Sequence, residues 1–148
     1  MDTNSSDKLI DALVGKQFRY GFKSPDMDLY DLGFGCDIVF MNADGKRQEA
    51  CQFALHLVGG IFAYWKDGRK EEFYGNTHPS AFQKSIQNLI GENVRRVALS
   101  DKNDLWLDLG QCNIVIVTLD SGDESWRLFT PGADAPHLVA SNISLYQE

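Results

Sequence analysis

Cys36-Asp37-Ile38-Val39-Phe40 and Cys112-Asn113-Ile114-Val115-Ile116 are two versions of one motif, and the second follows the first by 76 positions. The same spacing separates two further pairs of segments, Leu13-Val14-Gly15-Lys16 from Leu89-Ile90-Gly91-Glu92 and Asp28-Leu29-Tyr30 from Asp104-Leu105-Trp106. Three matching blocks in one register indicate an internal duplication, and this repeat guides the interpretation of the rest of the chain.

A fourth pair of segments, Ala54-Leu55-His56-Leu57-Val58 and Ala135-Pro136-His137-Leu138-Val139, is separated by 81 positions, which indicates a longer loop in the second copy. The copies then span about residues 5–76 and 77–148. Each copy is too short to bury its own apolar face well. We therefore predict one domain over residues 1–148, in which the copies share a core around a pseudo-twofold axis.

Each copy is predicted to open with a helix. Apolar residues recur at helical spacing before each of two glycines: Leu9, Ile10, Leu13 and Val14 before Gly15, and Phe82, Ile86, Leu89 and Ile90 before Gly91. Either glycine can adopt the left-handed conformation that ends a helix. Ser5 and Ser6 are candidate N-caps of the first helix, and Ser80 with Gln83 is a capping-box pair for the second.

After each glycine the apolar pattern changes to that of strands. The second copy contains six candidate strands, at residues 94–99, 105–109, 113–119, 125–129, 137–140 and 143–146. In the first copy, Asn42-Ala43-Asp44-Gly45 and Asp67-Gly68 are predicted hairpin turns. The predicted fold class is α+β, with two tandem copies of a helix followed by antiparallel strands.

The segment Ile114-Val115-Ile116-Val117 has no polar residue in alternation. A strand of this kind is covered on both faces, so we expect it to be central in its sheet. Helices packed on the sheets would supply the cover.

The chain has 148 residues, and 14 Lys and Arg against 21 Asp and Glu give it a formal net charge of −7. Such a surface repels nucleic-acid phosphates and anionic lipid, and it attracts basic proteins. Three cysteines in no paired spacing favour free thiols in a reducing cytosol over a disulfide framework. Neither a membrane span nor a signal peptide is recognisable. We expect a cytoplasmic protein that binds neither nucleic acid nor membranes.

The repeated histidines His56 and His137 are the sharpest polar feature. With Cys36 and Cys112 they could supply a zinc site, but structural zinc sites use closely spaced ligand pairs that this sequence lacks. A Cys–His nucleophile is the second alternative, and no oxyanion-forming glycine turn stands beside any cysteine. The preferred interpretation is structural, with a buried thiol and a half-buried imidazole at equivalent corners of the two copies. We predict no catalytic residue, metal ligand or cofactor.

Acidic residues recur at matched positions of the two copies and cluster again in one loop. They do not form an EF-hand, because its glycine and glutamate positions are not filled. The alternatives are solvated turns and an acidic patch that steers a basic partner. The predicted partner-binding residues are Asp26, Asp28, Asp31, Asp101, Asp104, Trp106, Asp108, Asp120, Asp123 and Glu124.

Trp106 stands between Leu105 and Leu107, so strand alternation places its side chain on the opposite face from both leucines. With Asp108 on the same face, it would be an exposed aromatic anchor of the kind that dominates protein interfaces. The alternative is that Trp106 repeats Tyr30 and is buried under a helix. The usual burial of large aromatic side chains favours that alternative.

The segment Glu124-Ser125-Trp126-Arg127-Leu128-Phe129, with Pro131-Gly132 and Pro136-His137-Leu138-Val139 after it, resembles a module of small bacterial proteins. Some of these are similar to immunity proteins of polymorphic-toxin or contact-dependent growth inhibition systems. The resemblance covers mainly the second half of the chain. It implies a cytoplasmic protein that binds and blocks one toxin domain, and acidity would suit the basic active site of a nuclease toxin.

Two other classes of function stay open at this point. The first is a homodimeric structural or small-ligand-binding domain that uses the groove between the copies. The second is an enzyme or metalloprotein that uses the Cys and His pairs.

Overall fold

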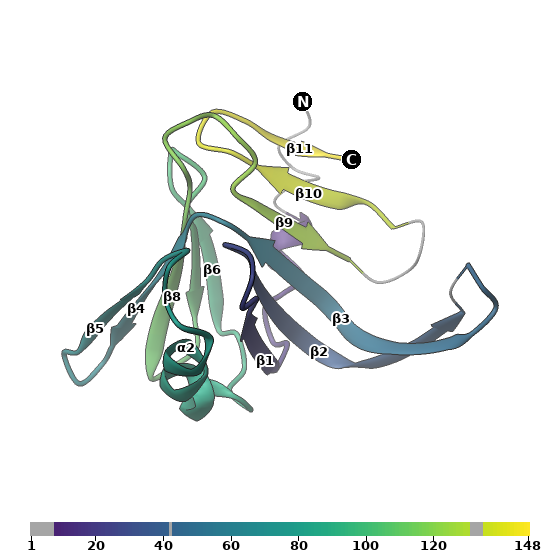
Figure 1. Ribbon diagram of the computed structural model, residues 1–148, viewed down its shortest axis with the longest axis horizontal. Helices are drawn as coiled ribbons and strands as arrows, with labels where there is room; N and C mark the ends of the chain where they lie inside the picture. Colours follow the sequence, from purple (N-terminus) through teal and green to yellow (C-terminus); the bar gives the residue numbers. More distant parts are fainter. Residues whose placement is uncertain (1–7, 42, 131–134) are drawn as a thin grey trace.

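The computed structural model describes residues 8–41, 43–130 and 135–148, and for residues 37–40 and 48–50 it describes the backbone alone. The described chain forms two antiparallel sheets that diverge like the sides of a V, with the short helix α2 (Pro79–Ile86) beneath them (Figure 1). The fold is therefore α+β, and strands make up most of its regular secondary structure.

The six-stranded sheet has the order β1-β2-β3-β9-β10-β11. Its strands are β1 (Phe18–Lys23), β2 (Tyr30–Met41), β3 (Arg47–Leu57), β9 (Trp126–Phe129), β10 (His137–Ala140) and β11 (Leu145–Gln147). The five-stranded sheet has the order β5-β4-β8-β7-β6. Its strands are β4 (Gly60–Trp65), β5 (Lys70–Phe73), β6 (Arg96–Leu99), β7 (Leu105–Asp108) and β8 (Cys112–Val117). Each sheet thus combines strands from both halves of the chain.

The strands predicted from the sequence are confirmed in kind and number for the second half, with small differences at their ends. The predicted hairpin turn at residues 42–45 joins β2 to β3, although Asn42 lies outside the described residues. The turn between β4 and β5 contains Gly68, whose φ of 96° needs a residue tolerant of the left-handed region. Short local turns of this type can be predicted from the sequence because glycine and aspartate favour them.

β8 is the central strand of its sheet, between β4 and β7, as its unbroken apolar run predicted. Ile114 and Ile116 belong to the core between the sheets. On the other face, Val115 is only 4% exposed. Its cover there comes from side chains of the flanking strands, because Phe62 and Trp106 are its direct cross-strand neighbours. The expectation that a helix covers this face is wrong.

Helix α2 begins two residues earlier than its predicted capping box. The N-cap is His78, whose Nδ1 accepts a hydrogen bond from the backbone N–H of Ser80 at 3.1 Å. Pro79 occupies the first helical position, where its fixed φ and missing N–H cost nothing. The predicted Ser80–Gln83 cap is therefore wrong, because the proline sets the start of the helix.

The buried side of α2 joins the two sheets. The ring of Phe82 lies 4.8 Å from that of Tyr30 on β2 and 5.1 Å from that of Phe73 on β5, measured between centroids. Both contacts are edge-to-face, the arrangement that aromatic quadrupoles favour. Phe82 and Ile86 are buried, as their spacing predicted.

The first predicted helix is a single turn over residues 8–11, and its candidate caps Ser5 and Ser6 lie outside the described residues. Ile10 and Leu13 are buried in the core. Gly15 and Gly91 have φ values of 85° and 99°, which confirms the left-handed conformation predicted for both.

The segments that follow these two glycines pair with each other. Residues Gln17 and Asn93 form an isolated antiparallel bridge. Four backbone hydrogen bonds surround it: Gly15 N–H to Val94 O (2.7 Å), Gly91 N–H to Phe18 O (2.8 Å), Phe18 N–H to Glu92 O (2.8 Å) and Val94 N–H to Lys16 O (2.9 Å). The first bond corresponds to the second, and the third to the fourth. In each pair the donor of the later bond lies 76 positions after the donor of the earlier one, and its acceptor lies 76 positions before.

Beyond this junction, the matched sequence blocks do not occupy corresponding places. Residues 36–40 continue β2 after a bulge and pair with β3, whereas residues 112–116 start a separate strand after the turn at Gly110. His56 and His137 lie on β3 and β10 of one sheet. The expectation of equivalent corners is wrong, because the second half turns where the first half runs straight on.

Candidate partner-binding surface

The outer face of the five-stranded sheet carries a row of aromatic side chains. Alternation along β4 turns Ile61, Ala63 and Trp65 into the core and leaves Phe62 and Tyr64 on the opposite face. Trp106 on β7 and Tyr74, directly after β5, complete the row. We call Phe62, Tyr64, Tyr74 and Trp106 the aromatic face.

The rings of the aromatic face touch one another across three strands. Trp106 is stacked with Tyr64, with 6.0 Å between centroids and 7° between planes. Phe62 lies edge-on to Tyr64 at 6.5 Å and to Tyr74 at 6.0 Å. Trp106 is 42% exposed and Tyr74 is 44% exposed. The preferred expectation that a helix buries Trp106 is wrong, and the contacts give a partner a preformed aromatic surface.

One edge of the aromatic face is bounded by a charged pair on β5. The ammonium of Lys70 lies 3.1 Å from Glu72 Oε1 and 5.3 Å from the centroid of the Phe62 ring. Hydrogen bonds from the Tyr74 hydroxyl, at 2.7 Å, and from Lys70 lower the pKa of Glu72. Glu72 therefore stays ionised, and the pair holds the neighbouring rings in position.

The other edge is a hollow beside Trp106. It is lined by Arg96, Val97, Ala98, Trp106, Asp108 and Asn113. Asp108 accepts a hydrogen bond from the backbone N–H of Gly110 at 2.8 Å, and this bond, with Arg96, lowers its pKa. Arg96 makes only long contacts of 3.4 Å with Asp108, and its side chain is 86% exposed. A partner side chain that enters here meets an indole, a carboxylate and an exposed guanidinium.

Two loops carry exposed carboxylates: one leads into the start of β7, and the other follows the end of β8. We call residues 100–104 and 118–124 the acidic end. Asp104 joins the loops, because it accepts hydrogen bonds from the N–H and Oγ1 of Thr118 at 2.8 and 3.0 Å. The backbone oxygen of Asn103 accepts a bond from the indole of the buried Trp126 at 2.8 Å. Asp101, Asp120 and Asp123 are exposed on this framework.

The structure divides the predicted partner-binding residues among three regions. It brings together those of the second half, since Trp106 and Asp108 lie on one face of β7, and Asp104 directly before the strand belongs to the acidic end. Glu124 belongs to the same end, although Arg127 holds it at 2.8 Å. Asp26 and Asp28 lie in the loop between β1 and β2, on the other sheet.

Asp31 belongs to a separate polar cluster on the outer face of the six-stranded sheet. It accepts a hydrogen bond from the Tyr20 hydroxyl at 3.2 Å, and His56 Nε2 lies 3.5 Å away. The ring of His56 packs on Phe129 at 4.6 Å, and His137 packs on the same ring at 4.3 Å. Burial and the Asp31 carboxylate raise the pKa of Tyr20, so its hydroxyl stays protonated.

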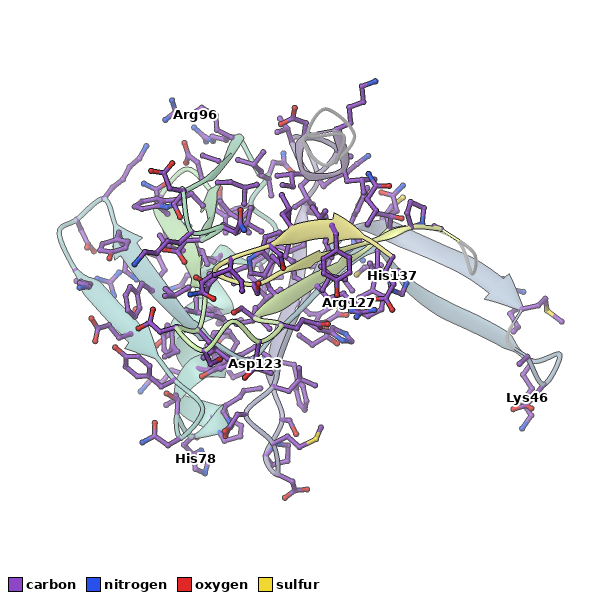
Figure 2. The ribbon with its side chains drawn as sticks, turned by 90° about the horizontal axis from the view of Figure 1, so that it is seen from above. Lys46, His78, Arg96, Asp123, Arg127 and His137 are labelled. Carbon is purple, nitrogen blue, oxygen red and sulfur yellow. The ribbon has the colours of Figure 1, made fainter. Side chains whose placement is uncertain are left out.

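This polar cluster ends in an ion-pair network around Arg127. Arg127 contacts both Glu124 and Glu148 at 2.8 Å, and its Nη1 is 3.3 Å from His137 Nδ1 (Figure 2). The carboxylates therefore already satisfy the guanidinium. The arrangement fixes β9 against its neighbours and leaves the Arg127 charge paired.

The cysteines do not meet the histidines. Cys36 is exposed on β2, and Cys112 is buried in β8 of the other sheet, so only one of the two expected buried thiols is confirmed. Burial raises the pKa of Cys112 to about 12, which leaves it a neutral thiol and a poor nucleophile. Among the side chains that the structure describes, no three of His, Cys, Asp or Glu are grouped to hold a metal ion.

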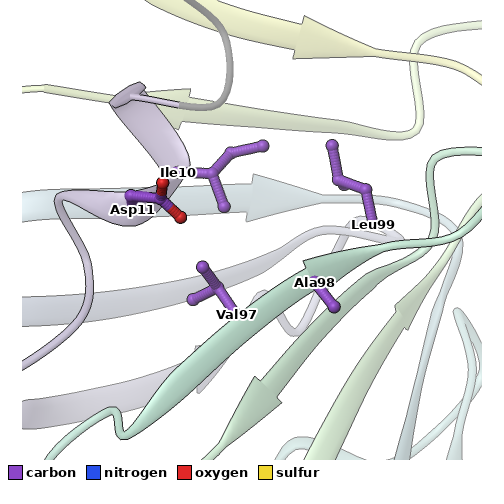
Figure 3. Close-up of a pocket in the computed structure, with 5 residues that line it drawn as sticks. All are labelled: Ile10, Asp11, Val97, Ala98 and Leu99. Atoms are coloured by element: carbon purple, nitrogen blue, oxygen red, sulfur yellow. The ribbon is translucent and has the colours of Figure 1, made fainter. Parts of the chain in front are cut away.

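A hollow between the halves is lined by Ile10 and Asp11 of the first helical turn and by Val97, Ala98 and Leu99 of β6 (Figure 3). Among the described residues that line it, Asp11 alone has an ionisable side chain. Ligand sites usually combine enclosure with several convergent polar groups. This hollow offers a single carboxylate at an apolar notch, which gives little support to the small-ligand alternative.

Sequence reasoning found Trp106 and missed the rings around it. Phe62 and Tyr64 could have been identified from the alternation in Ile61-Phe62-Ala63-Tyr64-Trp65, which places two aromatic residues on one face. Tyr74 carries no such signal, because its position depends on how β5 ends. Their contact with Trp106 depends on the pairing of β4 with β8, which are far apart in sequence.

No family model, curated protein or solved structure matches the chain. No helix in the described part of the chain is long and apolar enough to span a membrane.

Proposed function

We propose that this protein is an immunity-type inhibitor that binds a basic toxin domain, of the nuclease class, and blocks its active site by occlusion. The observation that carries the proposal is the aromatic face with the acidic end directly beyond it. Stacked, exposed aromatic rings supply the contact energy of protein interfaces. Carboxylates on ordered loops supply attraction for a basic partner. A protein with this task would act in the cytoplasm, where an incoming toxin meets its target.

Three features support a protein partner over a reaction. The net charge of −7 favours basic proteins and disfavours nucleic acid. The rings of the aromatic face are held by one another, so little side-chain entropy is lost when a partner binds. The ionisable cluster around Asp31 holds a protonated tyrosine and satisfied ion pairs, which do not supply a nucleophile.

The first test is capture of the partner with immobilised protein and its matched variants. Trp106→Ala should weaken binding by about 2 kcal/mol, roughly 30-fold in Kd, because it removes the largest exposed ring of the aromatic face. Tyr146→Ala is the control, since Tyr146 is 44% exposed on β11 of the other sheet. Co-expression with the captured toxin domain should restore growth for the Tyr146→Ala variant and fail for Trp106→Ala. Equal rescue by both variants would remove the aromatic face from the mechanism.

Replacement of Asp101, Asp120 and Asp123 together by Asn tests the acidic end. The association rate should fall and lose most of its dependence on salt, because long-range attraction acts before contact. The control replaces Asp11, Asp26 and Asp28 by Asn, which changes the net charge equally at exposed sites elsewhere. Stopped-flow measurement at low and high salt distinguishes the two. The same loss in both triple variants would mean that overall charge, rather than the acidic end, steers the partner.

We infer in addition that the two halves derive from one duplicated unit arranged around a pseudo-twofold axis. The reciprocal hydrogen bonds around Gln17 and Asn93 support this, because they relate positions 76 residues apart. The sheet orders support it as well. In the six-stranded sheet, β1-β2-β3 are followed by β9-β10. In the five-stranded sheet, β6-β7-β8 are followed in the same way by β4-β5. Each sheet therefore takes a three-stranded meander from one half and a hairpin from the other.

A further inference from the structure

Strands β2 and β3 extend beyond the rest of their sheet as a two-stranded arm. Residues 37–41 of β2 pair with residues 47–51 of β3, and the turn between them contains Lys46 at the far tip. Figures 1 and 2 show the arm projecting away from both sheets. The arm begins at a bulge between Phe34 and Asp37, where Gly35 has a φ of 90°.

The outer edge of the arm is unpaired throughout the described residues. β1 pairs with β2 only from Tyr30 to Phe34, and β9 pairs with β3 only from Ala54 to Leu57. The last backbone bond on the β1 side runs from Gly35 N–H to Gln17 O at 2.8 Å, and Gln17 itself forms the bridge to Asn93. Beyond it, the backbone N–H and C=O groups on the outer edge of residues 37–41 meet no other described strand.

Apart from Asp37 at its base, this edge lacks the protection that the other sheet edges carry. Proteins block edge strands with charged residues, with proline or by making the strand short. β1 carries Arg19, β6 carries Arg96, and β11 has three residues. β5 begins with Lys70, Glu71 and Glu72. In contrast, β2 ends with Ile38, Val39, Phe40 and Met41, four uncharged residues in succession.

An exposed apolar edge strand is a template on which a strand of another chain can pair. An isolated two-stranded ribbon is marginally stable in water, and a third strand adds a further ladder of hydrogen bonds. Met41 at the end of the run is 63% exposed in the single chain. The free edge can therefore accept a strand from outside the described chain.

We propose that the strand is β2 of a second copy, paired antiparallel across a twofold axis at Val39. This register sets Asp37 opposite Met41 and Ile38 opposite Phe40, so no like charges face each other and apolar residues meet apolar residues. A symmetric contact of this type is closed and gives a dimer. It lies on the arm, apart from the aromatic face, and leaves both copies of that face open to partners.

Sedimentation velocity of the full chain and two lysine variants tests the dimer. The wild-type protein should sediment at twice the 16.6 kDa chain mass. Val39→Lys should be a folded monomer by circular dichroism, because two cations would oppose each other at the axis. Val14→Lys, the same change at a site that is 45% exposed outside the arm, should stay dimeric. A monomeric wild type, or a Val39→Lys variant that sediments like Val14→Lys, overturns the proposal.

Cross-linking tests the register without weakening the pairing. In a Cys36→Ser background, V39C places two thiols directly opposite each other across the axis, within the reach of a disulfide. I38C is the matched control, because each introduced thiol then faces Phe40 instead of its own counterpart. V39C should oxidise to a covalent dimer much faster than I38C. Equal rates for the two variants would overturn the proposed contact.

Discussion

Three tryptophans of one chain have different roles because they lie on different faces of their strands. Trp126 is fully buried, and its indole N–H donates to Asn103 O at 2.8 Å. Trp65 points inward as well and donates to Glu71 Oε1 at 2.8 Å. Trp106 points outward and stacks on Tyr64. Buried indoles need a hydrogen-bond acceptor, whereas an exposed one is available for recognition.

The cysteines are expected to differ in reactivity according to burial. In the folded protein, a thiol reagent should modify the exposed Cys36 rapidly and leave Cys112 unmodified until the protein unfolds. Mass spectrometry of the labelled protein, before and after urea denaturation, measures the difference. Rapid labelling of Cys112 in folded protein would contradict its placement in the core.

The raised pKa of Cys112 also makes stability depend on pH. Burial raises this pKa from 9.0 to about 12, so between these values the unfolded chain loses a proton that the folded chain retains. The free energy of unfolding should therefore fall as pH rises above 9, by up to about 1.4 kcal/mol per unit. Cys112→Ala should remove this part of the decline. Urea unfolding of both proteins at pH 8 and above, within that window, gives the comparison.

At the scale of elements, the junction around Gln17 and Asn93 makes a symmetric prediction. Gly15 and Gly91 both occupy left-handed conformations, which cost a residue with a Cβ about 1–2 kcal/mol. Gly15→Ala and Gly91→Ala should each lower the free energy of unfolding by that amount. Asparagine tolerates this conformation better, so Gly91→Asn should cost less than Gly91→Ala. Chemical denaturation measures all three, and an unaffected Gly15→Ala variant would contradict the expected equivalence.

Strands were predictable as elements because their signals are local. The unbroken apolar run of β8 indicated a central strand, and β8 is the middle strand of the five-stranded sheet. The start of α2 was harder to predict, because histidine is a rarer N-cap than the serine that follows it. The bulge in β2 left no trace beyond Gly35, although it decides where the arm begins.

At the scale of the whole molecule, we expect a single cooperative unfolding transition. The core is one cluster that includes Phe34 and Leu55 of one sheet, Ile61 and Leu107 of the other, and Phe82 of α2. Loss of either sheet exposes the inner face of the other. Tryptophan fluorescence and far-UV circular dichroism should therefore give coincident urea curves. Two separate transitions would show that the sheets unfold independently.

The candidate site was predictable only in part. The acidic residues and Trp106 were identified from the sequence, because charge and alternation are properties of single segments. Phe62, Tyr64 and Tyr74 join Trp106 through the order β5-β4-β8-β7, which brings together strands from both halves. Asp31 was grouped with the other carboxylates and instead lies with His56 and Tyr20, since its strand belongs to the other sheet.

The sequence by itself determined the positions of most strands and turns, their antiparallel connection, and the acidic character of the surface. These follow from residue-to-residue periodicity and from composition, which need no knowledge of distant contacts. Only the tertiary structure decided which strands share a sheet and which face of each strand meets water. A period of two separates two faces of a strand, and the choice between them depends on burial against residues that are remote in sequence.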